Sequence, residues 1–282
     1  KASIKDRGGN SRYTNGAYRF AYNGFADLKK IILSLKNSNS IDYGKYPVSN
    51  FLKDLKKVTN GKTDKNLSKM LTSKSFETIL WLSKKGLKFK PIVGRQSFLV
   101  NGIMKYWGGL TLEVSGQGEK LVDSLLKITK KNKINIQYNT AAKSLIYKNN
   151  KVTGINVLKK GKVKKIFSKS VILACGGFEA NPKMRTKYLG RGWEKAKVRG
   201  TKYNTGDGLN MALKVGASAF GNWSGCHSVF HDMNGPEFSD LKVSNKYRKI
   251  SYPWGIVINA DGERFVDEGE DFRNYTYAKF GR

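Results

Sequence analysis

Glycines at three places in the sequence could bring the backbone close to a bound anion or cofactor. The first place is residues 8–16, which read GGNSRYTNG. Glycine permits positive φ angles and leaves backbone amides accessible, and successive exposed amides can form a concavity that binds an anion. The stretch therefore predicts a loop that holds a phosphate or the polar edge of a cofactor. An ordinary polar surface loop is the alternative, because such short motifs often occur by chance.

The other two glycine stretches lie at the ends of predicted elements. Residues 171–174 (VILA) form a continuous apolar run that ends at Gly176-Gly177. Such a run is typical of a buried parallel strand, and ligands of doubly wound sheets bind at the carboxyl ends of strands. Gly206-Asp207-Gly208 opens a predicted helix, where Asp207 could contact a cofactor hydroxyl or simply cap the helix. A turn without a ligand and a helix cap are the alternatives, and the cap is favoured for Asp207 taken alone.

A few titratable side chains could take part in acid–base chemistry. His227 and His231 are four residues apart, but no further histidine and no cysteine cluster supports a metal pair. We therefore expect no metal and favour a hydrogen-bonding or acid–base role, with His231 as ordinary surface. Arg264 and Arg273 lie in an acidic stretch, so salt bridges are the simpler role for both.

The composition limits the class of protein. The 282 residues carry a net charge of +32, with 39% hydrophobic and 12% aromatic residues, enough for one large or two ordinary domains. Such a positive charge suggests that the protein binds nucleic acid. The lysines, however, are scattered as pairs over many predicted elements, which favours a solvated surface and no nucleic-acid partner.

Cysteine usage and hydropathy suggest a compartment. Cys175 and Cys226 are too few for a disulfide framework, so we expect small buried side chains and a reducing environment. No run approaches the roughly 18 apolar residues that span a bilayer, and no signal peptide is recognisable at the start. These features predict a cytoplasmic protein.

Apolar periodicity predicts an α/β chain. Helices are expected over 27–35, in several pieces over 48–85, from 117 onward and from 207 to Gly216. The last piece of the second region would be capped by Ser73 or Ser75 and would end at Gly86. Strands are expected over 89–93, 134–138, 143–147, 152–157, 163–167 and 171–174, with a loop over 95–109. The best domain boundary lies near residue 225.

The motifs occur together in a recognisable order. They are GGNSRYTNG, GQGEKL, VILACGGFEANP, NTGDGLNMALKVGA, WSGCH and NADGERFVDEGEDFRNY. In this order they resemble the FAD-dependent fumarate reductase/succinate dehydrogenase flavoprotein superfamily, and most closely its tricarballylate dehydrogenase branch. The strand-GxGxxG-helix unit that precedes GGN in the superfamily has no counterpart, so the chain looks like a central part of such a protein.

The resemblance implies a fold and its division. Residues 1–225 would form most of a Rossmann-like FAD-binding domain with a β-rich insert. Residues 226–282 would begin an α+β capping domain that carries substrate-binding and catalytic residues. Asn10 stands where succinate dehydrogenases have the histidine that bonds covalently to the flavin, so the resemblance implies non-covalent FAD.

The resemblance also implies roles for single residues. The positions that match cofactor-binding positions are Gly8, Gly9, Asn10, Asn15, Gly16, Ala142, Ala174, Gly176, Gly177 and Asp207. Gly16 and His227 match substrate-binding positions, and Arg273 lies near the arginine that transfers a proton. The superfamily's Glu and Arg relay would fall near Lys249 and Tyr252, which departs from the fumarate reductase pattern.

The implied reaction is hydride transfer between flavin N5 and the β-carbon of a di- or tricarboxylate. Arg273 would move the proton at the neighbouring carbon, held by Glu268, Glu270 and Asp271, and His227 would bind a carboxylate. The electron acceptor is open, with a membrane-associated electron-transfer partner as one option. The alternatives are a ketosteroid dehydrogenase-like flavoenzyme that uses Tyr252, a basic nucleic-acid-binding module, and a chain that folds without holding FAD.

Overall fold

The computed structural model describes residues 1–93, 96–243, 246–248 and 254–268. The chain divides into two compact units. The terminal unit comprises Lys1–Tyr13 and Ile136–Arg282, and the middle unit comprises Thr14–Asn135. The predicted domain boundary near residue 225 stays a prediction.

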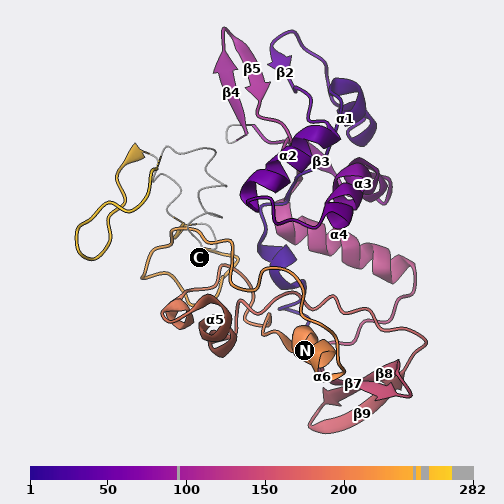
Figure 1. The fold of residues 1–282 in the computed structure, drawn as a ribbon. Helices are drawn as coiled ribbons and strands as arrows, with labels where there is room; N and C mark the ends of the chain where they lie inside the picture. The colour runs from indigo at the N-terminus through magenta and orange to yellow at the C-terminus, as the bar shows by residue number, and fades with distance from the viewer. Residues whose placement is uncertain (94–95, 244–245, 249–253, 269–282) are drawn as a thin grey trace. The chain divides into compact units, whose positions relative to one another are not determined.

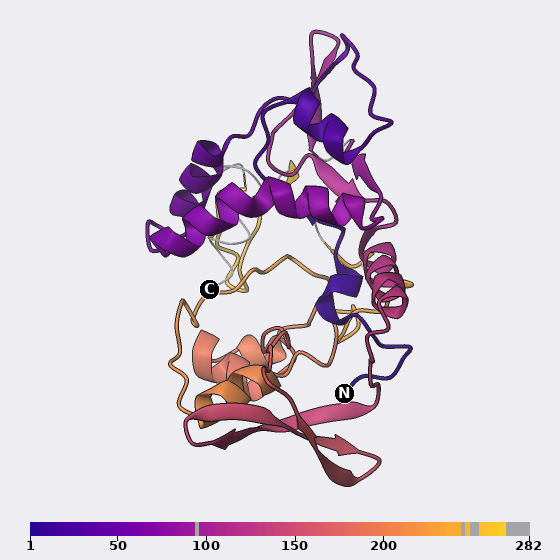
Figure 2. The ribbon, with the colours of Figure 1, turned by 90° about the vertical axis from the view of Figure 1, so that its right-hand side faces the viewer.

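The middle unit combines four helices with two small sheets in the described residues (Figures 1 and 2). The helices are α1 (Phe25–Ile31), α2 (Val48–Val58), α3 (Lys65–Lys84) and α4 (Gln117–Lys131). One sheet is antiparallel and has the order β1 (Ala17–Tyr18), β6 (Leu112–Val114), β3 (Phe89–Pro91). In the other, β5 (Ile103–Tyr106) lies between β2 (Ile41–Asp42), which is parallel to it, and β4 (Ser97–Val100), which is antiparallel.

Helix α3 is one continuous helix, so the predicted start at Ser73 or Ser75 is wrong. Its N-cap is Asp64, whose carboxylate accepts a hydrogen bond of 2.7 Å from the amide of Leu67. Ser75 is buried; its hydroxyl donates back to the carbonyl of Thr72 (2.8 Å) and accepts from the amide of Ala21 (2.9 Å). A serine can bond within a helix as well as cap one, and here the bond from Ala21 ties the helix to a neighbouring segment.

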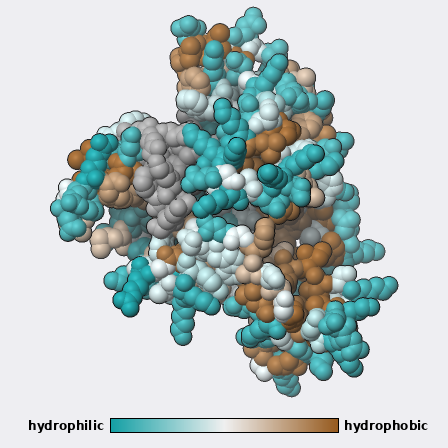
Figure 3. All heavy atoms as spheres, viewed as in Figure 1, coloured by the Kyte–Doolittle hydropathy of each residue, from teal (hydrophilic) through white to brown (hydrophobic). Residues whose placement is uncertain are grey.

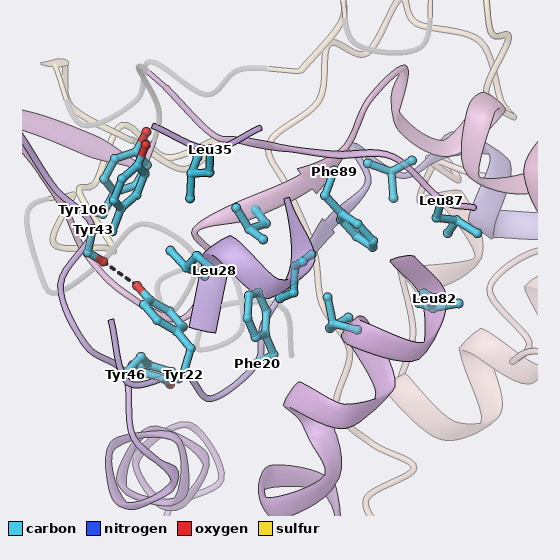
Figure 4. Close-up of a cluster of buried hydrophobic side chains, with 14 of the residues drawn as sticks. Phe20, Tyr22, Leu28, Leu35, Tyr43, Tyr46, Leu82, Leu87, Phe89 and Tyr106 are labelled. Atoms are coloured by element: carbon cyan, nitrogen blue, oxygen red, sulfur yellow. Dashed lines mark hydrogen bonds between the residues drawn. The ribbon is translucent and has the colours of Figure 1, made fainter. Parts of the chain in front are cut away.

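The core of the middle unit is rich in aromatic side chains (Figure 4). Phe20, Leu28 and Leu112 are fully buried, and the rings of Tyr43 and Tyr106 stack with centroids 5.2 Å apart. The buried Tyr22 hydroxyl donates to the carbonyl of Tyr43 (2.7 Å) and lies 2.6 Å from the Thr111 hydroxyl. A buried polar group without a partner is costly. The two contacts of this hydroxyl therefore stabilise the packing of three segments of the core.

The terminal unit contains one antiparallel meander of β7 (Thr140–Lys148), β8 (Lys151–Lys159) and β9 (Lys162–Phe167). Its helices are α5 (Pro182–Leu189) and α6 (Asp207–Lys214), and α6 packs against β7. The short 3₁₀ turns are η1 (Gly9–Tyr13) and η2 (Trp193–Lys195). The three strands predicted over 143–167 and the helix predicted from 207 are confirmed.

Four further predictions about the chain are wrong. Residues 134–138 and 171–174 are not strands, while the predicted loop over 95–109 contains β4 and β5. Ile172 is 89% exposed, and Cys175 is exposed, not buried. A parallel strand is stable only beside other strands, and residues 171–174 pair with no strand in the part of the chain that the structure describes.

The face seen in Figure 3 carries hydrophilic side chains over most of its extent, with apolar patches between them. Among the described residues, no helix is both long and apolar enough to cross a membrane.

We predict that Tyr22→Phe destabilises the protein by about 1–3 kcal/mol, because the Thr111 hydroxyl and the Tyr43 carbonyl lose a buried partner. Urea-induced unfolding measures the change. Tyr147→Phe is the control. This tyrosine is 46% exposed, and its hydroxyl donates a surface hydrogen bond of 3.2 Å to the side-chain oxygen of Asn150. An equal effect of the two variants would contradict the prediction.

Candidate functional site

The two later glycine stretches lie side by side in the terminal unit. The amide of Gly206 donates to the carbonyl of Gly177 (3.0 Å), and the amide of Ala180 donates to the carbonyl of Asn204 (2.9 Å). The segment after residues 171–174 therefore runs along the start of α6. This is the contact that brings Gly176 and Gly177 near Asp207.

Glycine is required on both sides of this contact. A Cβ at Gly176 would lie 2.6 Å from the side-chain nitrogen of Asn204, and Gly176 has a φ of +72°. A Cβ at Gly208 would lie 2.8 Å from the Cβ of Cys175. Real Cβ atoms do not approach so closely, because interiors are packed at van der Waals contact. The glycines of both motifs thus leave room for the side chains of Asn204 and Cys175 where the two segments meet.

Asp207 is the first residue of α6 and does not cap it. The N-cap is Gly206, with a φ of +77°. The Asp207 carboxylate accepts from the hydroxyl of Thr205 (2.9 Å) and from the ammonium of Lys1 (2.7 Å). Partial burial would raise the pKa of Asp207, but these hydrogen bonds outweigh it and lower the pKa. The carboxylate is thus ionised at the positive end of a helix, and 43% of its side chain is exposed to solvent.

The first glycine stretch is shared between the two units. In the terminal unit, Gly8 and Gly9 have φ angles of +102° and +54°, and nothing lies within 4 Å of a Cβ position at Gly9. The Asn10 side-chain oxygen Oδ1 accepts from the amide of Thr201 (2.9 Å). In the middle unit, the carbonyl of Gly16 accepts from the amide of Val114 (2.9 Å).

The remaining predicted cofactor residues occupy different settings. Asn15 lies in the middle unit, in the loop that precedes Gly16. Ala142 lies on β7 opposite Val157, beside a register shift, and Ala174 is exposed. Both alanines belong to the terminal unit.

The two histidines lie in unlike surroundings. His227 has a lowered pKa, first because its ring is partly desolvated and then because Arg199 is positively charged nearby. The His231 ring lies 3.1 Å from the carbonyl of Asp232 and stacks on Tyr247 at 6.0 Å. No group of three metal-ligating side chains gathers within the described ranges.

The acidic stretch is described only in part. Arg264 contacts Glu268 through Nε (3.0 Å) and Nη2 (2.5 Å), and the amide of Val257 donates to the other Glu268 oxygen (2.5 Å). The Arg264 and Val257 hydrogen bonds lower the pKa of Glu268 to about 2. The salt-bridge role predicted for Arg264 is confirmed. Arg273, with Lys249, Tyr252, Glu270 and Asp271, lies outside the described residues.

Arg185 is a structural residue that sequence reasoning missed. Its side chain is buried and donates to the carbonyls of Glu179, Trp193 (2.7 Å), Glu194 (2.7 Å) and Ala196 (3.1 Å). It therefore holds η2 against the segment that follows Gly177. In the sequence it resembles any basic residue of a polar helix, and no motif marks it.

The geometry fits an extended cofactor with anionic and hydroxyl groups. Open glycine backbone at Gly8 and Gly9 suits an anion. A carboxylate at the start of α6 suits hydroxyl or N–H donors, and the Gly176–Gly177 backbone lies beside it.

The family comparison decides the identity of the cofactor. The model of the FAD binding domain matches residues 33–280. The chain belongs to this family. FAD is accordingly its cofactor, and the predicted FAD-binding fold is confirmed.

Curated relatives include several oxidoreductases. NADH:acrylate oxidoreductase of Vibrio harveyi is 29% identical over 72% of this chain and 20% of its own length. The probable fumarate reductase Ifc3 of Shewanella frigidimarina is 26% identical over 77% of the chain and 35% of its length. A 3-oxosteroid 1-dehydrogenase of Mycobacterium tuberculosis is 27% identical over 59% of this chain and 30% of its own length. The chain thus spans between 20% and 35% of these relatives.

Solved structures share the fold. The open conformation of a flavocytochrome c3 fumarate reductase has a TM-score of 0.65 at 22% identity, over 95% of this chain and 43% of that one. The 3-ketosteroid Δ1-dehydrogenase from Sterolibacterium denitrificans has a TM-score of 0.70 at 19% identity, over 92% of this chain and 57% of that one.

We predict that Gly208→Ala destabilises the protein by about 1–3 kcal/mol through overpacking against Cys175. Alanine in a helix normally stabilises by roughly 0.5–1 kcal/mol relative to glycine, so the expected sign is reversed. Urea unfolding and FAD titration measure the effect. Gly255→Ala is the control because nothing lies within 4 Å of its Cβ position. Adding Cys175→Gly should restore stability, and a stabilising Gly208→Ala would contradict the prediction.

Proposed function

We propose that the whole protein is an FAD-dependent oxidoreductase that moves a hydride between the flavin and a CH–CH or C=C bond of a di- or tricarboxylate. The observation that carries this is the contact between the Gly176–Gly177 segment and the Gly206–Asp207 helix start, within a family that binds FAD. Relatives named for acrylate and for fumarate support an unsaturated carboxylate as substrate. Tricarballylate is the finer proposal, from the resemblance of the motifs.

The proposed cofactor contacts lie in both units. Within the terminal unit, Gly8, Gly9 and Asn10 would bind FAD non-covalently from η1, together with Ala142, Ala174, Gly176, Gly177 and Asp207. Asn15 and Gly16 would contribute from the middle unit. When bound, FAD supplies the hydride chemistry. We further propose that residues 1–225 form most of an FAD-binding domain and that residues 226–282 begin a capping domain.

His227 and Arg199 would together bind a substrate carboxylate. The lowered pKa of His227 keeps its imidazole neutral near pH 7, so the ring would donate a hydrogen bond without carrying charge. The guanidinium of Arg199 would supply the positive charge. Gly16 would border the substrate, and Arg273 would deliver or accept the proton at the carbon next to the hydride. Because Glu268 already binds Arg264, Glu270 and Asp271 would be the main carboxylates that orient Arg273.

A ketosteroid dehydrogenase-like activity is the second candidate. The 3-oxosteroid 1-dehydrogenase relative favours it, and Tyr252 would then be a catalytic tyrosine. A basic nucleic-acid-binding module and a chain without FAD are weaker alternatives, since the family match names FAD. We also propose a cytoplasmic location, a small-molecule substrate and an electron acceptor that could be a membrane-associated partner.

The decisive experiment is flavin reduction in the full-length protein. Succinate or tricarballylate should bleach the flavin absorbance, and a 3-ketosteroid should leave it unchanged. Bleaching by the steroid alone would favour the second candidate. Colourless protein that retards DNA with a steep salt dependence would favour the binding module.

We predict that Arg273→Lys keeps the flavin but loses most turnover. Lysine retains the positive charge, whereas the planar donor fork that would be held by carboxylates is lost. FAD absorbance and steady-state rates measure the two effects separately. Arg264→Lys serves as the control, because Arg264 is engaged with Glu268. Unchanged turnover in Arg273→Lys would remove this residue from the mechanism.

A further inference from the structure

Three aromatic side chains from separate parts of the terminal unit pack together. Phe178 directly follows Gly177, Tyr188 lies on α5, and Trp223 precedes His227 in the chain. The ring centroids of Phe178 and Tyr188 are 5.4 Å apart, and those of Tyr188 and Trp223 are 4.8 Å apart. Trp223 also stacks on Phe178 at 6.1 Å with an interplanar angle of 24°. We call these three side chains the aromatic trio.

Phe178 fixes one end of the trio to the proposed cofactor site. Its neighbour Gly177 accepts the hydrogen bond from the amide of Gly206. A Cβ at Gly206 would lie 3.1 Å from the Cβ of Phe178. The Phe178 side chain therefore begins at the point at which the two glycine segments meet, and its ring packs on Tyr188 and Trp223.

Trp223 fixes the other end to the segment that carries His227. Its indole N–H donates to the carbonyl of Phe220 (3.1 Å). Asn222 accepts from the amide of Ser224 (3.0 Å) and from its hydroxyl (2.9 Å). These bonds form a self-contained turn around the indole. His227 follows four residues later, a chain segment that spans at most about 14 Å.

We propose that Trp223 is a positioning residue. It packs on Phe178 and Tyr188 and thereby holds His227 at a fixed distance from the glycines proposed to bind FAD. The inference rests on the proposed role of His227 in binding a substrate carboxylate. Removing the indole ring leaves the two hydrogen bonds from Ser224 to the Asn222 side-chain oxygen in place. What is lost is the indole hydrogen bond to the Phe220 carbonyl and, with the ring contacts, the attachment of that turn to the cofactor segment.

The test uses full-length, FAD-loaded protein with Trp223→Ala, Trp223→Phe and the control Phe220→Ala. Phe220 lies in the same turn, but its side chain is 74% exposed. Flavin absorbance reports cofactor content, steady-state fumarate reduction gives KM and kcat, and NMR titration gives the pKa of His227. The His227 signal is assigned by its loss in His227→Gln.

Trp223→Ala should keep its flavin and raise the KM for fumarate about 10- to 100-fold, with a smaller change in kcat. The pKa of His227 should rise toward its ordinary value of about 6.5, because the ring moves into water and away from Arg199. Trp223→Phe should restore most of both properties, since a phenyl ring can still stack. Phe220→Ala should match the wild type.

An unchanged KM and an unchanged His227 pKa in flavin-loaded Trp223→Ala would overturn the proposal. If that variant fails to fold, Tyr188→Ala removes the ring on which Trp223 packs most closely and should move both readouts in the same direction; no movement would overturn the proposal equally. If the wild-type protein does not reduce fumarate, the proposed function fails for this substrate. The His227 titration then decides the positioning role alone.

Discussion

The approach of two backbones in the terminal unit is the constraint on which the proposed site depends. The Gly206 amide donates to the Gly177 carbonyl, and side chains added at Gly206 or Gly208 would collide with Met184 or Cys175 beside this contact. The approach sets the start of α6, and so it sets where Asp207 presents its carboxylate. It also places Phe178 at the glycine contact, and the aromatic trio links Phe178 to the turn that precedes His227. A local property of glycine thus determines the spacing of groups far apart in sequence.

Sequence alone predicted the elements whose stability is local. The strands of the β7–β9 meander are joined by short turns, and the start of α4 follows a glycine-rich signal, so neighbouring residues suffice to specify them. Residues 171–174 behave differently, because a parallel strand requires partners from elsewhere. An apolar run indicates that a segment can form a buried strand. Whether it is buried in this unit depends on which strands lie beside it.

The candidate site was predictable to the extent that it rests on motifs. Gly176, Gly177 and Asp207 were singled out in sequence, and the structure brings them together. Arg185 and Trp223 were not singled out as site residues, because their roles arise from tertiary contacts. Four carbonyls converge on the Arg185 guanidinium, and two rings meet the Trp223 indole. Neither arrangement leaves a periodicity or spacing that could be recognised in one sequence.

Charge and geometry contribute differently to the proposed chemistry. A net charge of +32 attracts any polyanion, so it cannot by itself distinguish a carboxylate from a nucleic acid. Discrimination needs groups at fixed positions. Asp207 is compensated locally by Lys1, and so a carboxylate can stand near an anionic cofactor without repelling it strongly. Burial and the positive charge of Arg199 lower the pKa of His227, which favours a neutral directional donor near one full charge. A planar carboxylate can use both, and that pairing, rather than the overall field, is what would select the substrate.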